Sequence, residues 1–152
     1  MPFYFVDTSA LVKRYHLEAG SSNVAAIFIE PDSSHVISRL GLVEAISAFA
    51  LKVREGQIQM TDFTLYRKRL LADVRNRTLS VIRVRVPHFK LADQLLQKHG
   101  LTSKLRTLDS LQLATALDLR ARAMLDHFVS ADVNLCKIAA AKGLSVVNPE
   151  AR

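Results

Sequence analysis

The sequence predicts an α/β protein whose mainly parallel β-sheet is covered by helices on both faces. Short β-favouring segments alternate along the chain with longer segments of helical periodicity, which is the order expected of strand-helix-strand units. The first of these strands, Phe3–Val6, is apolar throughout, as strands buried on both faces are. The chain has 152 residues and no internal repeat or linker, so we expect a single α/β/α domain.

The composition is that of an ordinary globular protein with a basic surface. Hydrophobic residues make up 49% of the chain and charged residues 23%, and no apolar run reaches the roughly 18 residues that cross a bilayer. The N-terminus has no secretory signal pattern and Cys136 is the single cysteine, so we expect a cytoplasmic protein without disulfides or membrane association. A formal net charge of +7 favours a polyanionic partner such as nucleic acid.

The first third of the chain predicts two strands, each followed by helices. The strand at Phe3–Val6 leads into a short helix from Ser9 to Tyr15, and a second helix follows over about 23–29. Residues 35–38 form the second strand, and residues 39–55 form a helix that stops at a glycine. The middle of this helix is apolar nearly all round, so we expect it to be packed on more than one side.

The rest of the chain continues the alternation. Helices are expected at residues 63–77, 88–99, 107–124 and 133–142, and strands at 80–86, 126–131 and 144–149. Thr61 or Asp62 is expected to cap the first of these helices, whose basic run Arg67–Arg69 is either a solvated face or a phosphate-contacting patch. Arg83 and Arg85 share one face of the strand at 80–86, which Pro87 would close.

Two aspartates follow directly after predicted strands. Asp7 comes at the end of the first strand, and Asp132 comes at the end of the strand at 126–131. Ligands of parallel α/β proteins bind in the crevice beyond the carboxyl ends of the strands. Each aspartate would also serve as the N-cap of the helix that follows it, so position alone leaves both roles open.

Two further acids are placed on helices. Glu44 is the one acid in an apolar segment, where an unpaired carboxylate must be neutralised, paired with a cation or bound to a metal unless it points to solvent. Asp109 lies in the first turn of its helix, where the helix dipole also favours an acid. Asp118 lies about 180° away around that helix, with Arg122 at i+4, so we expect Asp118 to face solvent and Asp109 to face inward.

These four acids could meet at one edge of the sheet. Four carboxylates cannot all be ionised at close range without cations, and oxygen ligands alone suit Mg²⁺ or Mn²⁺. The five histidines show no spacing typical of zinc ligands. Thr8, Ser9 and Ser130 stand beside the acids and could orient ligands or water. Metal ions held in this way activate water and stabilise phosphoryl oxygens, which is the chemistry of phosphodiester hydrolysis.

Four segments resemble, in order and spacing, the PIN domain of VapC-type toxins. They are Val6–Leu11, Glu44 in the helix after the second strand, Arg106–Ala116, and Phe128–Asp132 with the Ala-rich helix that follows. The resemblance implies one PIN domain over residues 1–152, with an α/β/α fold and the activity of a Mg²⁺- or Mn²⁺-dependent ribonuclease. Its acidic ligands would correspond to Asp7, Glu44, Asp109 and Asp132. The resemblance also implies a homodimer and inhibition by a VapB-type antitoxin whose C-terminal segment occupies the site.

The hypothesis that follows is an endoribonuclease acting as the toxin of a toxin–antitoxin pair. One alternative is a PIN-like module that binds RNA or a protein without cutting, and a chelator would leave its binding unchanged. The other is a DNA nuclease with the same pocket, which matched RNA and DNA substrates would distinguish.

Overall fold

The computed structural model describes residues 1–151, and its centre is a parallel β-sheet. Within these residues the sheet has five strands in the order β3-β2-β1-β4-β5, and every neighbouring pair is parallel. The strands are β1 (Phe3–Val6), β2 (Ser34–Ser38), β3 (Ser80–Ile82), β4 (His127–Val129) and β5 (Val146–Val147). The predicted parallel sheet is confirmed.

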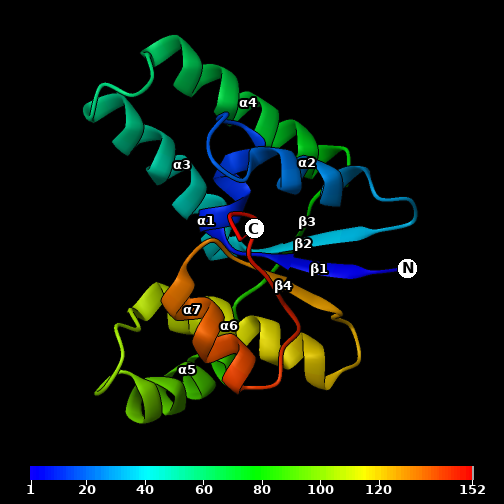
Figure 1. Ribbon diagram of the computed structural model, residues 1–152, viewed down its shortest axis with the longest axis vertical. Helices are drawn as coiled ribbons and strands as arrows, with labels where there is room; N and C mark the ends of the chain where they lie inside the picture. Colours follow the sequence, from blue (N-terminus) through cyan, green and yellow to red (C-terminus); the bar gives the residue numbers. More distant parts are fainter. Residues whose placement is uncertain (152) are drawn as a thin grey trace.

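Helices cover both faces of this sheet, as predicted. They are α1 (Thr8–Leu11), the 3-10 helix η1 (Val12–Arg14), α2 (Ser21–Ile29), α3 (Arg39–Arg54), α4 (Met60–Arg75), α5 (Val86–His99), α6 (Thr107–Ala121) and α7 (Val133–Ala141). Figure 1 shows α2, α3 and α4 on one side of the sheet and α5, α6 and α7 on the other. No helix in residues 1–151 is long and apolar enough to cross a membrane.

The alternation of side chains along the strands builds a separate hydrophobic core on each face. Phe5 and Val36 pack with side chains of α5, α6 and α7. Tyr4, Val6 and Ile37 point to the opposite face and pack with side chains of α1, α3 and α4. Because successive strand residues face opposite ways, the continuous apolar run in β1 fills both cores at once.

The order of the strands creates a topological switch point beside β1. The chain passes from β1 outward to β2 and β3, and then returns across the sheet so that β4 pairs with the other side of β1. In open parallel sheets, the crevice at such a reversal, beyond the carboxyl ends of the strands, is where ligands bind. The residues that follow β1 and β4 therefore occupy the favoured position for a site.

The strand predicted at residues 80–86 is shorter than expected. β3 ends at Ile82, and α5 already begins at Val86, with Pro87 in its first turn. Proline has no N–H to lose at this position and its φ suits a helix, so it starts the helix here and does not close a strand. The backbone N–H of Arg85 donates to Nδ1 of His88 at 2.9 Å. The prediction that Arg83 and Arg85 share a strand face is wrong.

The two longest helices also differ from their predicted form. Gln59 is the N-cap of α4, and its backbone N–H donates to Asp62 at 2.8 Å, so neither Thr61 nor Asp62 is the cap. In α3, Ala45 and Phe49 are buried, but Val43 and Leu51 are 61% and 43% exposed. α3 nevertheless packs against α1, α4 and α6, so the predicted packing on more than one side is confirmed, and only the face with Val43 and Leu51 is open.

Candidate functional site

Asp7 and Asp132 lie at the switch point, and each of them caps a helix. The carboxylate of Asp7 accepts from the backbone N–H of Ser9 at 3.4 Å, at the start of α1. The carboxylate of Asp132 accepts from the backbone N–H of Leu135 at 3.0 Å, at the start of α7. β1 and β4 are adjacent, so the two caps stand at neighbouring strand ends. The sequence left helix capping and a place in the site as alternative roles for these two aspartates. In the structure both aspartates cap a helix and also lie at the favoured position for a site.

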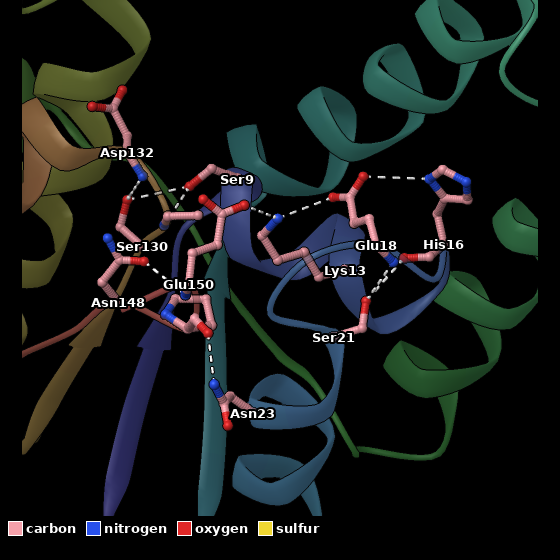
Figure 2. A network of polar contacts seen from close by, with 12 residues as sticks. Ser9, Lys13, His16, Glu18, Ser21, Asn23, Ser130, Asp132, Asn148 and Glu150 are labelled. Atoms are coloured by element: carbon pink, nitrogen blue, oxygen red, sulfur yellow. Dashed lines mark hydrogen bonds and ion pairs between the residues drawn. The ribbon is translucent and has the colours of Figure 1, made fainter. Parts of the chain in front are cut away.

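Two serine hydroxyls hold the carboxylate of Asp7. Ser9 Oγ donates to Asp7 Oδ2 at 2.7 Å, and Ser130 Oγ donates to the same oxygen at 3.0 Å. In Figure 2 the two serines face each other, and their hydroxyl oxygens are 3.2 Å apart. Ser9 Oγ accepts from the N–H of Ala131, and Ser130 Oγ accepts from the N–H of Asp132. These bonds tie the start of α1 to the segment between β4 and α7.

Asp7 is a buried carboxylate without a cation. It is 4% exposed, and no Lys, Arg or His in residues 1–151 forms an ion pair with it. Burial raises the pKa of Asp7, and the charge of Asp109 raises it further, against the hydrogen bonds from the two serines. A cation bound to Asp7 would offset both the cost of burying its charge and the repulsion from Asp109.

Glu44 is held by a buried amide that the sequence analysis missed. Gln112 Nε2 donates to Glu44 Oε1 at 3.0 Å and to Thr8 Oγ1 at 3.2 Å. The Gln112 carbonyl accepts from Ser38 Oγ at 2.7 Å. Burial raises the pKa of Glu44, and Asp7 and Asp109 raise it further. Glu44 is therefore half-buried and lies within electrostatic reach of Asp7 and Asp109.

A signal for Gln112 was present in the sequence. It is the one amide in the apolar run of α6, and a buried amide needs hydrogen-bond partners. A Cβ at Gly41 would lie 3.0 Å from Gln112 Nε2, so the glycine lets α3 approach the amide. Gln112 thus links three elements that carry site residues: α1, α3 and α6.

Asp109 faces inward, as predicted, whereas the Asp118 side chain is only 27% exposed and does not simply face solvent. Asp109 is buried, and Arg106 Nε donates to its Oδ2 at 3.2 Å. Asp118 pairs with Arg122 Nε at 3.1 Å, as expected from the i+4 spacing. It also contacts His88 Nε2 at 2.9 Å, a bond between α5 and α6 that the sequence did not indicate.

Two of the acids, Glu44 and Asp109, line an open depression at this edge of the molecule. Glu44, Arg106, Thr107, Leu108 and Asp109 line a space of about 270 Å³. Among residues 1–151, no three His, Cys, Asp or Glu side chains lie close enough together to share a metal ion as they stand. The structure thus brings Asp7, Glu44 and Asp109 within electrostatic reach of one another, without closing them around a point.

The donor set nevertheless fits Mg²⁺ or Mn²⁺. In the part of the chain that is described, the hydrogen bonds to each acid reach one of its two oxygens, which are Asp7 Oδ2, Glu44 Oε1, Asp109 Oδ2 and Asp132 Oδ1. For Asp7, Asp109 and Asp132, one carboxylate oxygen is therefore held by the protein, and no hydrogen bond among the described residues reaches the other. Mg²⁺ takes one or two protein carboxylates and keeps several waters, so it needs no closed cage.

Comparison with known families and structures gives one consistent fold. The sequence model of the family described as PIN domain matches residues 4–141. No curated protein matches the chain. Several solved structures match over nearly its whole length.

Three of these structures illustrate the similarity. VapC20 of Mycobacterium tuberculosis, described as a sarcin-ricin loop cleaving toxin, is 17% identical, with a TM-score of 0.66 over 98% of each chain. A chain of a toxin–antitoxin complex from Klebsiella pneumoniae is 18% identical, with a TM-score of 0.62 over 96% of this chain and 97% of that one. A chain of VapBC2 from Rickettsia felis, bound to a promoter DNA fragment, is 17% identical, with a TM-score of 0.63 over 96% and 98%. At these identities the similarity establishes the fold.

Proposed function

The chain belongs to the PIN domain family, and we propose that it is a Mg²⁺- or Mn²⁺-dependent endoribonuclease acting as the toxin of a toxin–antitoxin pair. The observation that carries this proposal is the mutual repulsion of Asp7, Glu44 and Asp109 at the switch point, where Asp7 has no cation partner in residues 1–151. Neighbouring carboxylates of this kind, whose charges raise the pKa of Asp7 and of Glu44, are suited to holding a divalent cation. We propose Asp132 as the fourth member of the set.

Each residue of the proposed site has a separate task. Asp7, Glu44, Asp109 and Asp132 would hold the metal, which when bound supplies an activated water and stabilises charge on a phosphate. Ser9 and Ser130 favour the ionised form of Asp7 and fix its orientation. Gln112 does the same for Glu44 and connects it to Thr8. These hydrogen bonds fix the orientation of Asp7 and Glu44 before a metal binds, although the acids must still draw together to share one ion.

The proposed substrate and partners have independent support. A net charge of +7 favours RNA, since cations around an acidic pocket can contact phosphates. The fold is shared with a toxin described as cleaving the sarcin-ricin loop and with chains of toxin–antitoxin complexes. We therefore propose a VapB-type antitoxin that covers the site, a homodimer and a cytoplasmic location. The proposed PIN domain spans residues 1–152, of which Arg152 lies outside the described residues.

Cleavage of RNA by the purified chain tests this proposal. In Mg²⁺ or Mn²⁺ the protein should cut a mixed RNA pool, and EDTA should stop it. Asp7→Asn should lower the rate by more than about 100-fold, beyond the loss expected for a residue that only orients a ligand. Asp93→Asn is the matched control, because Asp93 lies exposed on α5 with Gln97 as its partner, and it should cut normally.

Each failure of this experiment favours a different function. Full activity of Asp7→Asn would remove Asp7 from the site. RNA binding without cutting, unaffected by EDTA, would indicate a binding module. Faster cutting of a matched DNA substrate would indicate a DNA nuclease.

A further inference from the structure

Arg106 is the one cation paired with the four acids in residues 1–151. It is the N-cap of α6, and its Nε lies 3.2 Å from Asp109 Oδ2. Its side chain is 71% exposed, whereas that of Asp109 is 12% exposed. No other ion pair among these residues includes Asp7, Glu44, Asp109 or Asp132. The proposed site thus has a single internal counterion, placed at its rim.

The charge of Arg106 acts on more than one acid. Its hydrogen bond with Asp109 raises the pKa of the guanidinium, and the charges of Asp132 and Glu44 add to this effect. Arg106, Asp109 and Glu44 also line the same depression of about 270 Å³. The guanidinium therefore stands between the acids and the solvent from which a substrate would approach.

We propose that Arg106 exchanges partners during function. Its guanidinium pairs with Asp109 while the acids hold no metal, and it pairs with a phosphate of the nucleic acid once a divalent cation is bound. This inference rests on the proposed function, because it requires that the acids hold a metal and that the substrate is a polyanion.

The exchange follows from competition for one carboxylate. A divalent cation on Asp109 would repel a guanidinium 3.2 Å from the same carboxylate and weaken their pair. The exposed Arg106 side chain has room to turn outward, and its planar fork binds phosphate oxygens through two parallel hydrogen bonds. Metal frees Arg106 for the phosphate, and the phosphate draws Arg106 away from the metal ligand. By linkage, bound metal should therefore strengthen the binding of the phosphate, and bound phosphate should strengthen the binding of the metal.

Calorimetric titration with Mn²⁺, without RNA, tests the first half of the proposal. Arg106→Gln should bind Mn²⁺ about fivefold more tightly than the wild type, which is the upper end of what an exposed ion pair contributes. Arg122→Gln is the matched control, because it removes an equal charge from an exposed pair, with Asp118 at 3.1 Å, at the other end of α6. Its affinity for Mn²⁺ should be unchanged. An Arg106→Gln affinity equal to or weaker than that of the wild type would overturn the inference.

Cleavage kinetics at saturating Mn²⁺ test the second half. Arg106→Gln should raise KM for an RNA oligonucleotide by about tenfold, as expected for the loss of a charged hydrogen bond, and should lower kcat less. Arg106→Lys keeps the charge but not the planar fork of donors, so its KM should lie between those of the wild type and Arg106→Gln. An unchanged KM for Arg106→Gln would overturn the phosphate contact.

The titration and the cleavage assay together separate this inference from the proposed function. RNA cleavage by the wild type with no effect of Arg106→Gln on Mn²⁺ binding would leave the ribonuclease standing and overturn the exchange. Tighter Mn²⁺ binding by Arg106→Gln with no RNA cleavage by the wild type would support the counterion and refute the ribonuclease. Absence of saturable Mn²⁺ binding by the wild type would overturn the exchange outright.

Discussion

At the scale of single residues, the central feature is the enclosure of Asp7. Its side chain receives hydrogen bonds from Ser9 and Ser130, both to Oδ2. Hydrogen bonds of this kind orient a carboxylate, but they do not cancel the cost of burying its charge. The raised pKa of Asp7, caused first by burial and also by Asp109, expresses that remaining cost.

Because the Asp7 carboxylate is buried, we predict that removing its charge stabilises the metal-free protein. A raised pKa means that the folded state disfavours the ionised form, so the charge at neutral pH lowers stability. Asp7→Asn keeps an acceptor for both serines and removes the charge. We expect its free energy of unfolding in urea with EDTA to exceed that of the wild type by about 1 to 3 kcal/mol.

The same two proteins should respond differently to metal. Mn²⁺ should raise the thermal midpoint of the wild type, because a ligand that binds the folded state stabilises it. It should leave Asp7→Asn nearly unchanged. A less stable Asp7→Asn in EDTA would show that the carboxylate makes a stabilising contact outweighing its burial.

At the scale of elements, an ion pair holds α4 against the start of the chain. Asp73 on α4 accepts from Arg14 Nε at 2.8 Å and from the hydroxyl of Tyr15 at 2.6 Å. Burial alone would raise the pKa of Asp73, but the bonds from Arg14 and Tyr15 lower it below its usual value. The docking of α4 therefore depends on an ionised Asp73.

This arrangement predicts a pH-dependent loss of stability in Asp73→Asn. An acid whose pKa is lowered by folding contributes fully above its unfolded pKa, near 3.9, and its contribution disappears as pH falls through the folded pKa. We expect Asp73→Asn to cost about 1 to 3 kcal/mol at neutral pH, and less below about pH 4, in urea unfolding. A deficit that stayed constant across this range would indicate lost packing and not a lost charge.

At the scale of the whole molecule, a buried lysine joins the two ends of the chain. Lys13 is 6% exposed, and its Nζ lies 2.7 Å from Glu150 and 3.2 Å from Glu18. Figure 2 shows Lys13 between these two carboxylates. Asn23 Nδ2 also donates to the backbone carbonyl of Pro149 at 2.7 Å. The segment after β5 is thereby fixed against η1 and α2, next to the strand ends that carry the proposed site.

A double-mutant cycle should measure the interaction between Lys13 and Glu150. We expect Lys13→Met and Glu150→Gln to show a coupling energy of about 1 kcal/mol in urea unfolding, a limited value because Glu150 is 42% exposed. Lys13→Met with Asp93→Asn should show none, since Asp93 pairs with Gln97 on α5. Zero coupling in the first cycle would show that the chain end is held by Asn23 and packing alone.

Much of the fold could be predicted because it depends on local patterns. The apolar run of β1, the alternation of strands and helices and the stop signals are properties of neighbouring residues, and they placed Asp7 and Asp132 at strand ends before any contact was known. Helical spacing likewise separated Asp109 from Asp118, although it did not indicate that Asp118 is partly buried against His88. The predicted strand at 80–86 was too long, because β3 ends at Ile82 and α5 begins at Val86. A short pattern of this kind suits both a strand and the start of a helix.

By itself, then, the sequence determined the order of the elements, the parallel sheet and the identity of the candidate acids. Only the tertiary structure decided which side chains meet them. Gln112 reaches Glu44 across 68 residues, and Ser130 reaches Asp7 across 123. Arg106 was part of a predicted motif, but its pairing with Asp109 depends on the side-chain geometry at the start of α6. The spacing of residues along the chain determines which face or end of an element a side chain occupies. Its hydrogen-bond partners depend on how separate elements pack together.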